Sequence, residues 1–216
     1  MLNKILGIVE KGIVSRSSKR AVIIGVNGID ASGKTKFAVS LSEYLSKTGH
    51  HTQLIHLDDF HNQKSIRHQG INEIDAYINN AFNSDLLINE LLKPIRDKNA
   101  VDKKLTLLDL ESDEYNVVKR FNIQKDTLVI VEGVLLFRPP LNDYFDYRIF
   151  LDISFDKMLK RASKRDIPRL GQSFMERYHT KYIPIQKWYL EKFEPAKISD
   201  LLIDNNDHTR SRIIKT

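Results

Sequence analysis

The sequence predicts a single α/β domain of three layers, in which helices cover both faces of a mostly parallel, five-stranded sheet. Two observations lead to this fold class. Five short apolar runs alternate along the 216 residues with segments whose apolar residues recur at helical spacing. A glycine-rich turn, GIDASGKT at 28–35, stands between the first apolar run and the helical pattern that follows it.

The predicted strands are short, apolar and bounded by turn residues, which distinguishes them from helices. They cover 21–26, 51–57, 127–133, 147–153 and 200–204. The predicted helices begin with an amphipathic helix inside residues 1–20 and continue with a helix that follows the glycine turn and ends at Gly49. Further helical patterns lie near 72–93, 154–166 and 173–193. The polar stretch 98–124 predicts an irregular segment that could hold a short strand or hairpin.

The composition restricts the class of protein. The chain has no cysteine, which excludes disulfides, thiolate metal sites and a cysteine nucleophile and is compatible with a reducing cytosol. No run approaches the ~18 apolar residues that a membrane span needs, and the N-terminal segment lacks a signal-peptide pattern. We therefore expect a cytoplasmic protein that does not bind membranes. The net charge of +6 suits anionic ligands, and a nucleic-acid binder would share it.

The turn at 28–35 fits the pattern G-x-x-x-x-G-K-[ST], which holds nucleotide phosphates. Its glycines let backbone N–H groups point at phosphate oxygens, its lysine reaches the β- and γ-phosphates, and its hydroxyl binds Mg²⁺. The preceding strand and the following helix supply the context that this mechanism needs. We therefore predict a P-loop NTPase fold that uses ATP and Mg²⁺. The predicted nucleotide contacts are Gly28, Ala31, Ser32, Gly33, Lys34, Thr35 and Lys36.

Acidic residues follow the ends of two predicted strands, where ligands bind in an open parallel sheet: Asp58, Asp59 and Glu132. Beside an anionic nucleotide, such carboxylates suit the acceptance of a proton from a substrate hydroxyl or the binding of Mg²⁺. A helix N-cap is the structural alternative for Asp58. Asp30, inside the glycine turn, is either a solvated turn residue or a group near the γ-phosphate.

A wider resemblance rests on five segments in order: GIDASGKT, LDDFHN, VIVEGVLLF, DKMLKRASKRD and YIPIQKWYLEKFEPAKISDLLID. Over residues 21–204 the chain resembles the uridine kinase family and its relatives, including the nicotinamide riboside kinases. The resemblance implies that Asp58 is the catalytic base, close to the metal. It also implies that Thr35 and Glu132 hold magnesium. Two arginines of a lid, Arg161 and Arg165, would clamp the phosphates and join Lys34 in catalysis.

The lid is also supported by the helical pattern at 154–166, whose apolar residues form one stripe and whose basic residues lie on the outer side. A solvated basic face is the alternative, although guanidinium groups suit phosphate oxygens better than ammonium groups do. Within one domain of residues 1–216 we expect three special segments. They are the leading helix at 1–20, an acceptor-binding insertion at about 60–125 and the lid at about 154–172.

The acceptor region departs from the family pattern. The segment NNAFNSDLL has Asn83 where the family places an aspartate that holds the ribose, and LTLLDLESDEYN has no histidine and arginine in the expected places. The phosphate-binding residues are therefore predicted to be intact and the acceptor pocket altered. Candidate acceptor contacts are His61, Tyr77, Phe82, Asn83 and Arg169, together with Arg67, His68 and Tyr115.

The sequence thus predicts a kinase that transfers the γ-phosphoryl group of ATP to a hydroxyl of a small, nucleoside-like acceptor. Two alternatives of the same fold are a kinase of a non-nucleoside alcohol such as pantothenate and a nucleotide-dependent regulatory NTPase. Against the regulatory class, SKRD at 163–166 lies within a helical pattern and not after an apolar strand, as a base-reading N-K-x-D segment would. We expect no nucleic-acid partner, since the basic surplus gathers in the lid helix and the tail. A homo-oligomer is compatible with the sequence.

Overall fold

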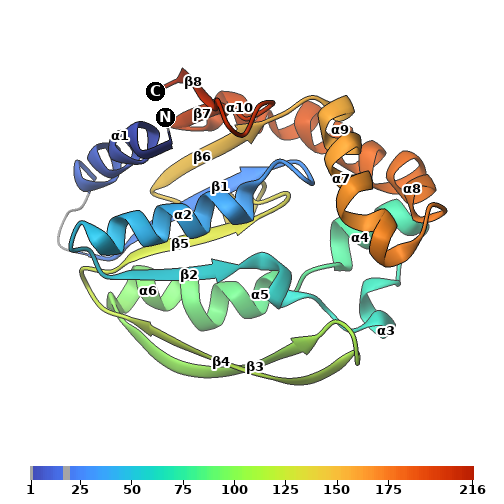
Figure 1. The fold of residues 1–216 in the computed structure, drawn as a ribbon. Helices are drawn as coiled ribbons and strands as arrows, with labels where there is room; N and C mark the ends of the chain where they lie inside the picture. Colours follow the sequence, from blue (N-terminus) through green and yellow to red (C-terminus); the bar gives the residue numbers. More distant parts are fainter. Residues whose placement is uncertain (1, 17–19) are drawn as a thin grey trace.

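The computed structural model describes residues 2–16 and 20–216 and is built around a six-stranded sheet (Figure 1). The strand order is β2-β5-β1-β6-β7-β8, with β8 antiparallel to β7 and the other neighbours parallel. The three-layer α/β fold predicted from the sequence is confirmed, and each of the predicted strands is present. The strands are β1 Val22–Gly28, β2 Thr52–His56, β5 Leu128–Gly133, β6 Tyr147–Asp152, β7 Leu201–Asp204 and β8 Arg212–Lys215.

The sheet has one strand more than the five predicted. The additional strand, β8, has four residues and lies at the edge of the sheet, and its Ile214 is 57% exposed. A strand this short and this exposed shows no buried apolar run in the sequence. For that reason β8 was not predicted.

Helices cover both faces of the sheet because successive strand residues point to opposite sides. On one face, α1 (Leu2–Val14) and α2 (Lys34–Lys47) pack on residues such as Ile24 of β1. On the other face, α6 (Lys93–Lys98) and α9 (Ile183–Phe193) pack with residues such as Ile23. The leading helix predicted inside residues 1–20 is present as α1, and residues 1 and 17–19 lie outside the described part.

The helical pattern predicted near 72–93 is not one helix. It divides into α4 (Glu73–Asn80) and α5 (Ser84–Leu87), and a π-helical turn at Ile88–Leu92 then leads into α6. The break falls where the Asn83 side chain accepts a hydrogen bond from the Leu86 N–H and caps α5. Capping of this kind starts a new helix inside a continuous apolar pattern. The helical pattern predicted near 173–193 is confirmed. It forms α8 (Phe174–Arg177), a π-helical turn at Tyr178–Tyr182 and α9, which follow one another without a gap.

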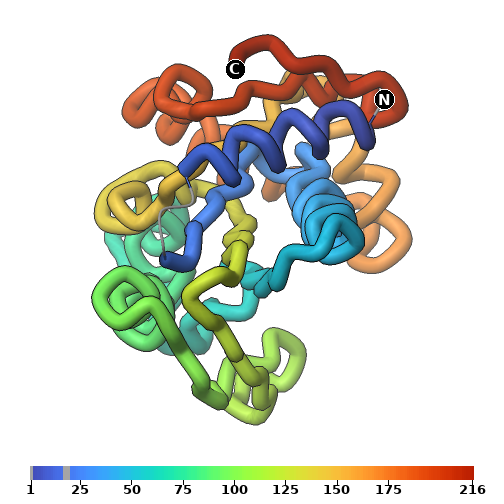
Figure 2. The backbone as a smooth tube through the Cα atoms, turned by 90° about the vertical axis from the view of Figure 1, so that its left-hand side faces the viewer, coloured from blue at the N-terminus to red at the C-terminus, as the bar shows by residue number. Residues whose placement is uncertain are grey.

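The stretch 98–124 is more regular than predicted. It forms a long antiparallel hairpin of β3 (Val101–Asp109) and β4 (Glu114–Ile123), which projects from the body of the molecule in Figure 2. Leu107, Phe121 and Ile123 face the core, while most of the polar side chains between them are exposed. A hairpin with one solvent-exposed face shows weak hydrophobic patterning. The sequence therefore predicted a shorter and less regular segment than the structure contains.

The carboxyl ends of the parallel strands all point to one side of the molecule, on the right in Figure 1. The short helix η1 (Leu57–Phe60) follows β2 there, and α3 (Lys64–Arg67), α4, α8 and the predicted lid helix α7 (Phe155–Leu170) gather beside it. A further short turn, η3 (Leu141–Tyr144), and α10 (Pro195–Ile198) complete the helices. In the described part of the chain, none of the helices has the length and apolar character to cross a membrane.

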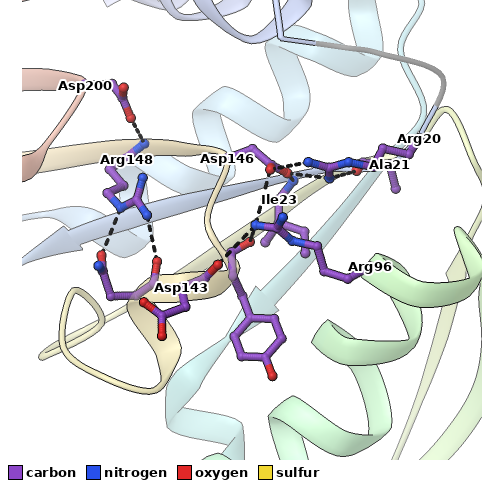
Figure 3. Close-up of polar contacts among 10 residues, drawn as sticks. Arg20, Ala21, Ile23, Arg96, Asp143, Asp146, Arg148 and Asp200 are labelled. Carbon is purple, nitrogen blue, oxygen red and sulfur yellow. Dashed lines mark hydrogen bonds and ion pairs between the residues drawn. The ribbon is translucent and has the colours of Figure 1, made fainter.

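At the amino ends of the strands, a polar cluster fixes the sheet to its connections (Figure 3). The carboxylate of Asp146, whose side chain is 10% exposed, accepts two hydrogen bonds from Arg20, at 2.6 and 2.9 Å. It also accepts one from the Ile23 N–H, at 2.9 Å, and pairs with Arg96 at 3.4 Å. The cluster therefore joins the start of β1 to the turn before β6.

Replacing Asp146 with asparagine is expected to lower the free energy of unfolding by about 3 kcal/mol, since two arginines lose a sheltered carboxylate. The matched control is Asp102→Asn, which breaks the exposed pair with Arg120, whose side chains are 57% and 59% exposed. That change is expected to cost less than about 1 kcal/mol. Urea unfolding of both variants tests this, and equal losses would show that the Asp146 cluster is no stronger than a surface pair.

Candidate active site

The glycine turn between β1 and α2 has the backbone of a phosphate-binding loop. Gly33 caps α2 with a φ of 92°, a conformation that side chains rarely adopt. The N–H groups of Gly33, Lys34, Thr35 and Lys36 find no acceptor in residues 2–16 and 20–216. They point from the start of a 14-residue helix, where the helix dipole also favours negative charge. The turn can therefore bind an anion.

The first half of the loop is held by the protein itself. The Ser32 N–H donates to the Ile29 carbonyl at 3.1 Å, and the Ala31 N–H donates to the Asp30 carboxylate at 2.9 Å. The Gly28 N–H donates to the Asn27 side chain at 2.7 Å. The nucleotide contacts predicted at Gly28, Ala31 and Ser32 therefore lack free N–H groups. Gly28 is needed for packing, because a Cβ there would lie 2.7 Å from the Leu151 carbonyl oxygen.

Arg161 of α7 supports this loop from behind. Its guanidinium donates to the carbonyls of Ala31 and Ser32, both at 3.3 Å, and to that of Asn205 at 2.6 Å. The Asn205 side chain also donates to the Ser32 carbonyl at 2.7 Å. With its donors on carbonyl oxygens, Arg161 holds the loop in shape, and the clamping of phosphates that the resemblance implies for it stays a prediction.

Thr35 and Glu132, predicted to hold magnesium, are in contact. The Thr35 hydroxyl donates to the Glu132 carboxylate at 3.1 Å, where β5 ends beside α2. Glu132 is 2% exposed, and His56 binds it at 2.7 Å, which raises the pKa of His56. A hydroxyl and a carboxylate are the oxygen donors that Mg²⁺ takes in nucleotide sites. These two residues therefore fit magnesium, whereas no hydrogen bond joins Asp58 to either of them in the described structure.

Asp58 lies in a cleft of about 230 Å³ between the phosphate loop and α7 to α9. The cleft is lined by Lys34 of the loop and by Arg165 of the predicted lid helix, together with Asp30. Lys34 is only 9% exposed, so its ammonium group faces this cleft from a sheltered position. Asp59, the next residue, pairs instead with Lys119 of the hairpin at 2.6 Å. The structure thus separates the two neighbouring acids and directs one of them to the cleft.

Arg165 is held at the wall of the cleft by a polar network. Its guanidinium donates to both carboxylate oxygens of Asp166, at 2.7 and 2.9 Å, and to the Tyr178 hydroxyl at 2.8 Å. It also approaches the Asp30 carboxylate at 3.4 Å. The Tyr178 hydroxyl lies 2.8 Å from Asp30 and 2.6 Å from Asp166, and burial together with these carboxylates raises its pKa. The network connects the predicted lid to the phosphate loop.

The four members of this network were only partly predicted. Arg165 and Asp30 were identified from the sequence, and Asp30 proves to be a bonded group and not a solvated turn residue. Burial raises the pKa of the Asp30 carboxyl, but Lys34, Arg165 and Tyr178 outweigh that effect and leave it lowered. Tyr178 and Asp166 were missed. They lie in two separate helical patterns, and the periodicity of apolar residues does not show that a hydroxyl on one helix bonds to a carboxylate on the other.

Tyr178→Phe is expected to lower the free energy of unfolding by about 1–3 kcal/mol, because two sheltered carboxylates lose their shared hydroxyl. Tyr182→Phe is the matched control, since the Tyr182 hydroxyl makes no hydrogen bond with any described residue although its ring packs 5.2 Å from that of Tyr178. Chemical denaturation of both proteins measures the difference. A loss in the control as large as that in Tyr178→Phe would mean that the hydroxyl network contributes nothing.

The predicted acceptor contacts are divided between two places. His61 and Tyr77 line the cleft with Asp58, and His61 donates from Nδ1 to the Asp58 carbonyl at 2.7 Å. Phe82 and Asn83 line a neighbouring hollow. Arg169 is exposed on α7 and lines neither, so the structure does not bring it to the cleft. The less specific candidates Arg67, His68 and Tyr115 also line neither hollow.

Gln186 of α9 is a cleft residue that the sequence did not indicate. It is 1% exposed, and its side-chain oxygen has no hydrogen-bond partner in the described residues. A buried amide oxygen without a partner is costly. Gln186 therefore offers the cleft an unused acceptor for a ligand hydroxyl or amine.

Comparison with known proteins identifies the family of this chain. Residues 23–193 match the model of the phosphoribulokinase / uridine kinase family. A uridine kinase of Ligilactobacillus salivarius is 28% identical over 196 residues, 88% of each chain, and one of Clostridium botulinum is 25% identical over 195 residues, 89% of this chain and 92% of the relative. The fold is also that of a structure described as a possible uridine kinase from Bacillus stearothermophilus, with a TM-score of 0.71 and 22% identity over 93% of this chain and 98% of that one. The resemblance predicted from the sequence is confirmed: the chain belongs to the phosphoribulokinase / uridine kinase family and is a kinase of that type, a phosphotransferase with an alcohol group as acceptor.

Proposed function

We propose that this kinase uses ATP with Mg²⁺ and phosphorylates a hydroxyl of a small, nucleoside-like acceptor bound in the cleft at Asp58. One observation carries the proposal. The cleft brings a carboxylate, Asp58, to the same space as Lys34 of an anion-binding loop. A base and a cationic phosphate site facing each other are the parts that phosphoryl transfer to an alcohol requires.

In the proposed reaction, Asp58 accepts the proton of the acceptor hydroxyl as its oxygen bonds to the γ-phosphorus. The bond from that phosphorus to the β–γ bridging oxygen breaks, and ADP leaves. Lys34 and the free N–H groups at the start of α2 stabilise the charge that spreads over the phosphoryl oxygens. Magnesium, when bound at Thr35 and Glu132, would neutralise charge on the β- and γ-phosphates. Arg165 would serve the transferred group by exchanging its carboxylate partners for phosphate oxygens.

The nucleotide base has a suitable hollow beside the loop. A space of about 300 Å³ is lined by Leu2 of α1 and Phe37 of α2, with Arg161 and His208 also on its wall. Apolar side chains with a cationic and an aromatic neighbour suit a purine ring. The hollow adjoins Gly33, so a nucleotide whose phosphates occupy the turn can extend its base into it.

The proposal is tested by the release of ADP from ATP in the presence of magnesium, with and without candidate acceptors such as uridine and other nucleosides. We expect release to depend on the acceptor. Hydrolysis of the nucleotide at one rate, whatever acceptor is added, would instead favour the regulatory NTPase. Competition between ATP and GTP for the same site would measure the preference for the base.

A non-nucleoside alcohol is the second candidate acceptor. The observation in its favour is that the Asn83 side-chain oxygen is used as the cap of α5. In the family pattern this position holds a ribose, and a capping oxygen is not free to do so.

A further inference from the structure

An arginine without a partner lies beside the cleft. Arg138 follows β5 and lines a hollow of about 450 Å³. It is half-buried, yet its guanidinium makes no hydrogen bond or ion pair with any described residue. Other half-buried arginines do find partners: Arg20 binds Asp146, Arg67 binds Asp113 and Arg148 binds Asn142. Sheltering an unpaired charge is unfavourable unless something outside the chain neutralises it.

The side chains around Arg138 add hydrogen-bond donors. The hollow is lined by Asn62, Asn79 and Asn83, among others. Because the Asn83 oxygen caps α5, its amide nitrogen is left for another acceptor, and that nitrogen has no partner in the described residues. Asp85 is the one acid on the wall, and it is exposed and does not pair with Arg138. A guanidinium and a side-chain amide suit a carboxylate or a phosphate group.

The hollow and the cleft are neighbours, because aromatic side chains that line one of them pack against those that line the other. His61 lines the cleft and Phe82 lines the hollow, and their rings lie 4.4 Å apart. Tyr77 lines the cleft and packs edge-on against Phe82 at 6.0 Å. Burial, with the carboxylates of Asp30 and Asp58, raises the pKa of the Tyr77 hydroxyl, and Arg138 opposes them. The Tyr77 hydroxyl therefore lies within electrostatic reach of both Asp58 and Arg138.

We propose that Arg138 and the Asn83 amide bind an anionic group of the acceptor, so that the substrate is a hydroxy acid or a phosphorylated alcohol. This inference rests on the proposed kinase function and favours its second candidate acceptor, a non-nucleoside alcohol, because it assigns the far end of the molecule whose hydroxyl is at Asp58. A neutral nucleoside would leave the guanidinium without a counter-charge. An anionic acceptor supplies that charge and is fixed at two points, the reacting hydroxyl and the anion.

The first test compares acceptors that differ in one charge. D-Glycerate is paired with glycerol, pantothenate with pantothenol, and ribose 5-phosphate with ribose, and phosphorylation is followed with ATP and magnesium. We expect the wild-type protein to prefer at least one anionic member over its neutral partner by 10-fold or more in kcat/KM. The first two pairs test a carboxylate and the third a phosphate. Equal use of neutral and anionic partners, or a preference for uridine over all of them, would overturn the inference and leave the proposed kinase function standing.

The second test uses Arg138→Gln. We expect KM for the preferred anionic acceptor to rise about 10- to 100-fold, the loss that follows from one charge-assisted hydrogen bond, while KM for ATP is unchanged. Arg138→Lys should recover part of the affinity, and Arg120→Gln, on the exposed hairpin, is the control. An unchanged KM in Arg138→Gln contradicts the role of this residue.

Binding without turnover provides an independent readout. D-Glycerate, pantothenate and ribose 5-phosphate should each be tested for an increase in Tm of the wild-type protein and for the loss of that increase in Arg138→Gln. No increase with any of the three would count against the anion site, even if the protein proves to be inactive as a kinase. Failure of the proposed function would appear differently, as the absence of a phosphorylated product from every acceptor, uridine included.

Discussion

Asp58→Asn is expected to lower kcat about 10²- to 10⁴-fold, the usual contribution of a general base, while ATP still binds. The carboxylate lies in the cleft with Lys34 and has no ion pair with a described residue to explain it structurally. Asparagine keeps the shape of the side chain but cannot take the proton of the acceptor hydroxyl. Steady-state kinetics with a saturating acceptor measures the loss, and calorimetry measures binding of the nucleotide.

The neighbouring acid provides the control. Asp59 pairs with Lys119 on the hairpin at 2.6 Å, so Asp59→Asn removes a partly exposed ion pair and leaves the cleft intact. We expect it to retain most of the wild-type kcat. If both variants kept full activity, Asp58 would have no part in the chemistry. If both lost activity equally, the effect would belong to the position of η1 and not to the base.

Lys34→Met is expected to lower kcat about 10²- to 10³-fold and also to weaken the binding of ATP, because the ammonium group is the cationic side chain of the phosphate loop. Lys34 is the first residue of α2 and is 9% exposed, facing the cleft. Methionine has a similar length and helix propensity, so α2 should persist. Nucleotide binding and acceptor-dependent release of ADP are the two measurements.

Lys47→Met, in the last turn of the same helix, is the matched control for Lys34→Met. Its side chain is exposed and far along α2 from the loop, so activity and nucleotide affinity should be unchanged. Wild-type affinity for ATP in Lys34→Met would mean that the loop holds the phosphates through its backbone alone. Circular dichroism of both proteins confirms that the helix is retained.

The fold could be predicted because its strands are apolar enough to be recognised one at a time. The central strands β1 and β5 are buried along their whole length, as in Val22 to Val26, and the glycine turn fixes the order of strand, loop and helix. The parts of the fold that were predicted wrongly depend on contacts between segments. The strand β8 is stabilised by pairing with β7, and the break before α5 depends on the Asn83 cap. Neither feature changes the local pattern of apolar residues, so neither could be predicted from it.

The site was predictable where one short motif carries the chemistry. The loop spacing identified Lys34 and Thr35, and the ends of strands identified Asp58 and Glu132, which the structure brings to one edge of the sheet. The motif could not show which N–H groups of the loop are already bonded, since that is decided by backbone geometry and by Arg161.

Side-chain contacts between residues far apart in the sequence could not be predicted either. Tyr178 meets Asp30 across 148 residues, and the isolation of Arg138 is visible only when every neighbour has been placed. The most informative residues of the cleft walls are therefore the ones that periodicity treats as ordinary helix or loop positions.

The destination of the γ-phosphate is the most direct test of the central claim. Phosphorus NMR of the protein with ATP, magnesium and an accepted alcohol follows that atom without assuming the acceptor's identity. The account predicts ADP together with a new phosphate monoester, in equal amounts, and formation of the monoester about 10²- to 10⁴-fold slower with Asp58→Asn. ADP accompanied only by inorganic phosphate, at a rate indifferent to the alcohol, would contradict it.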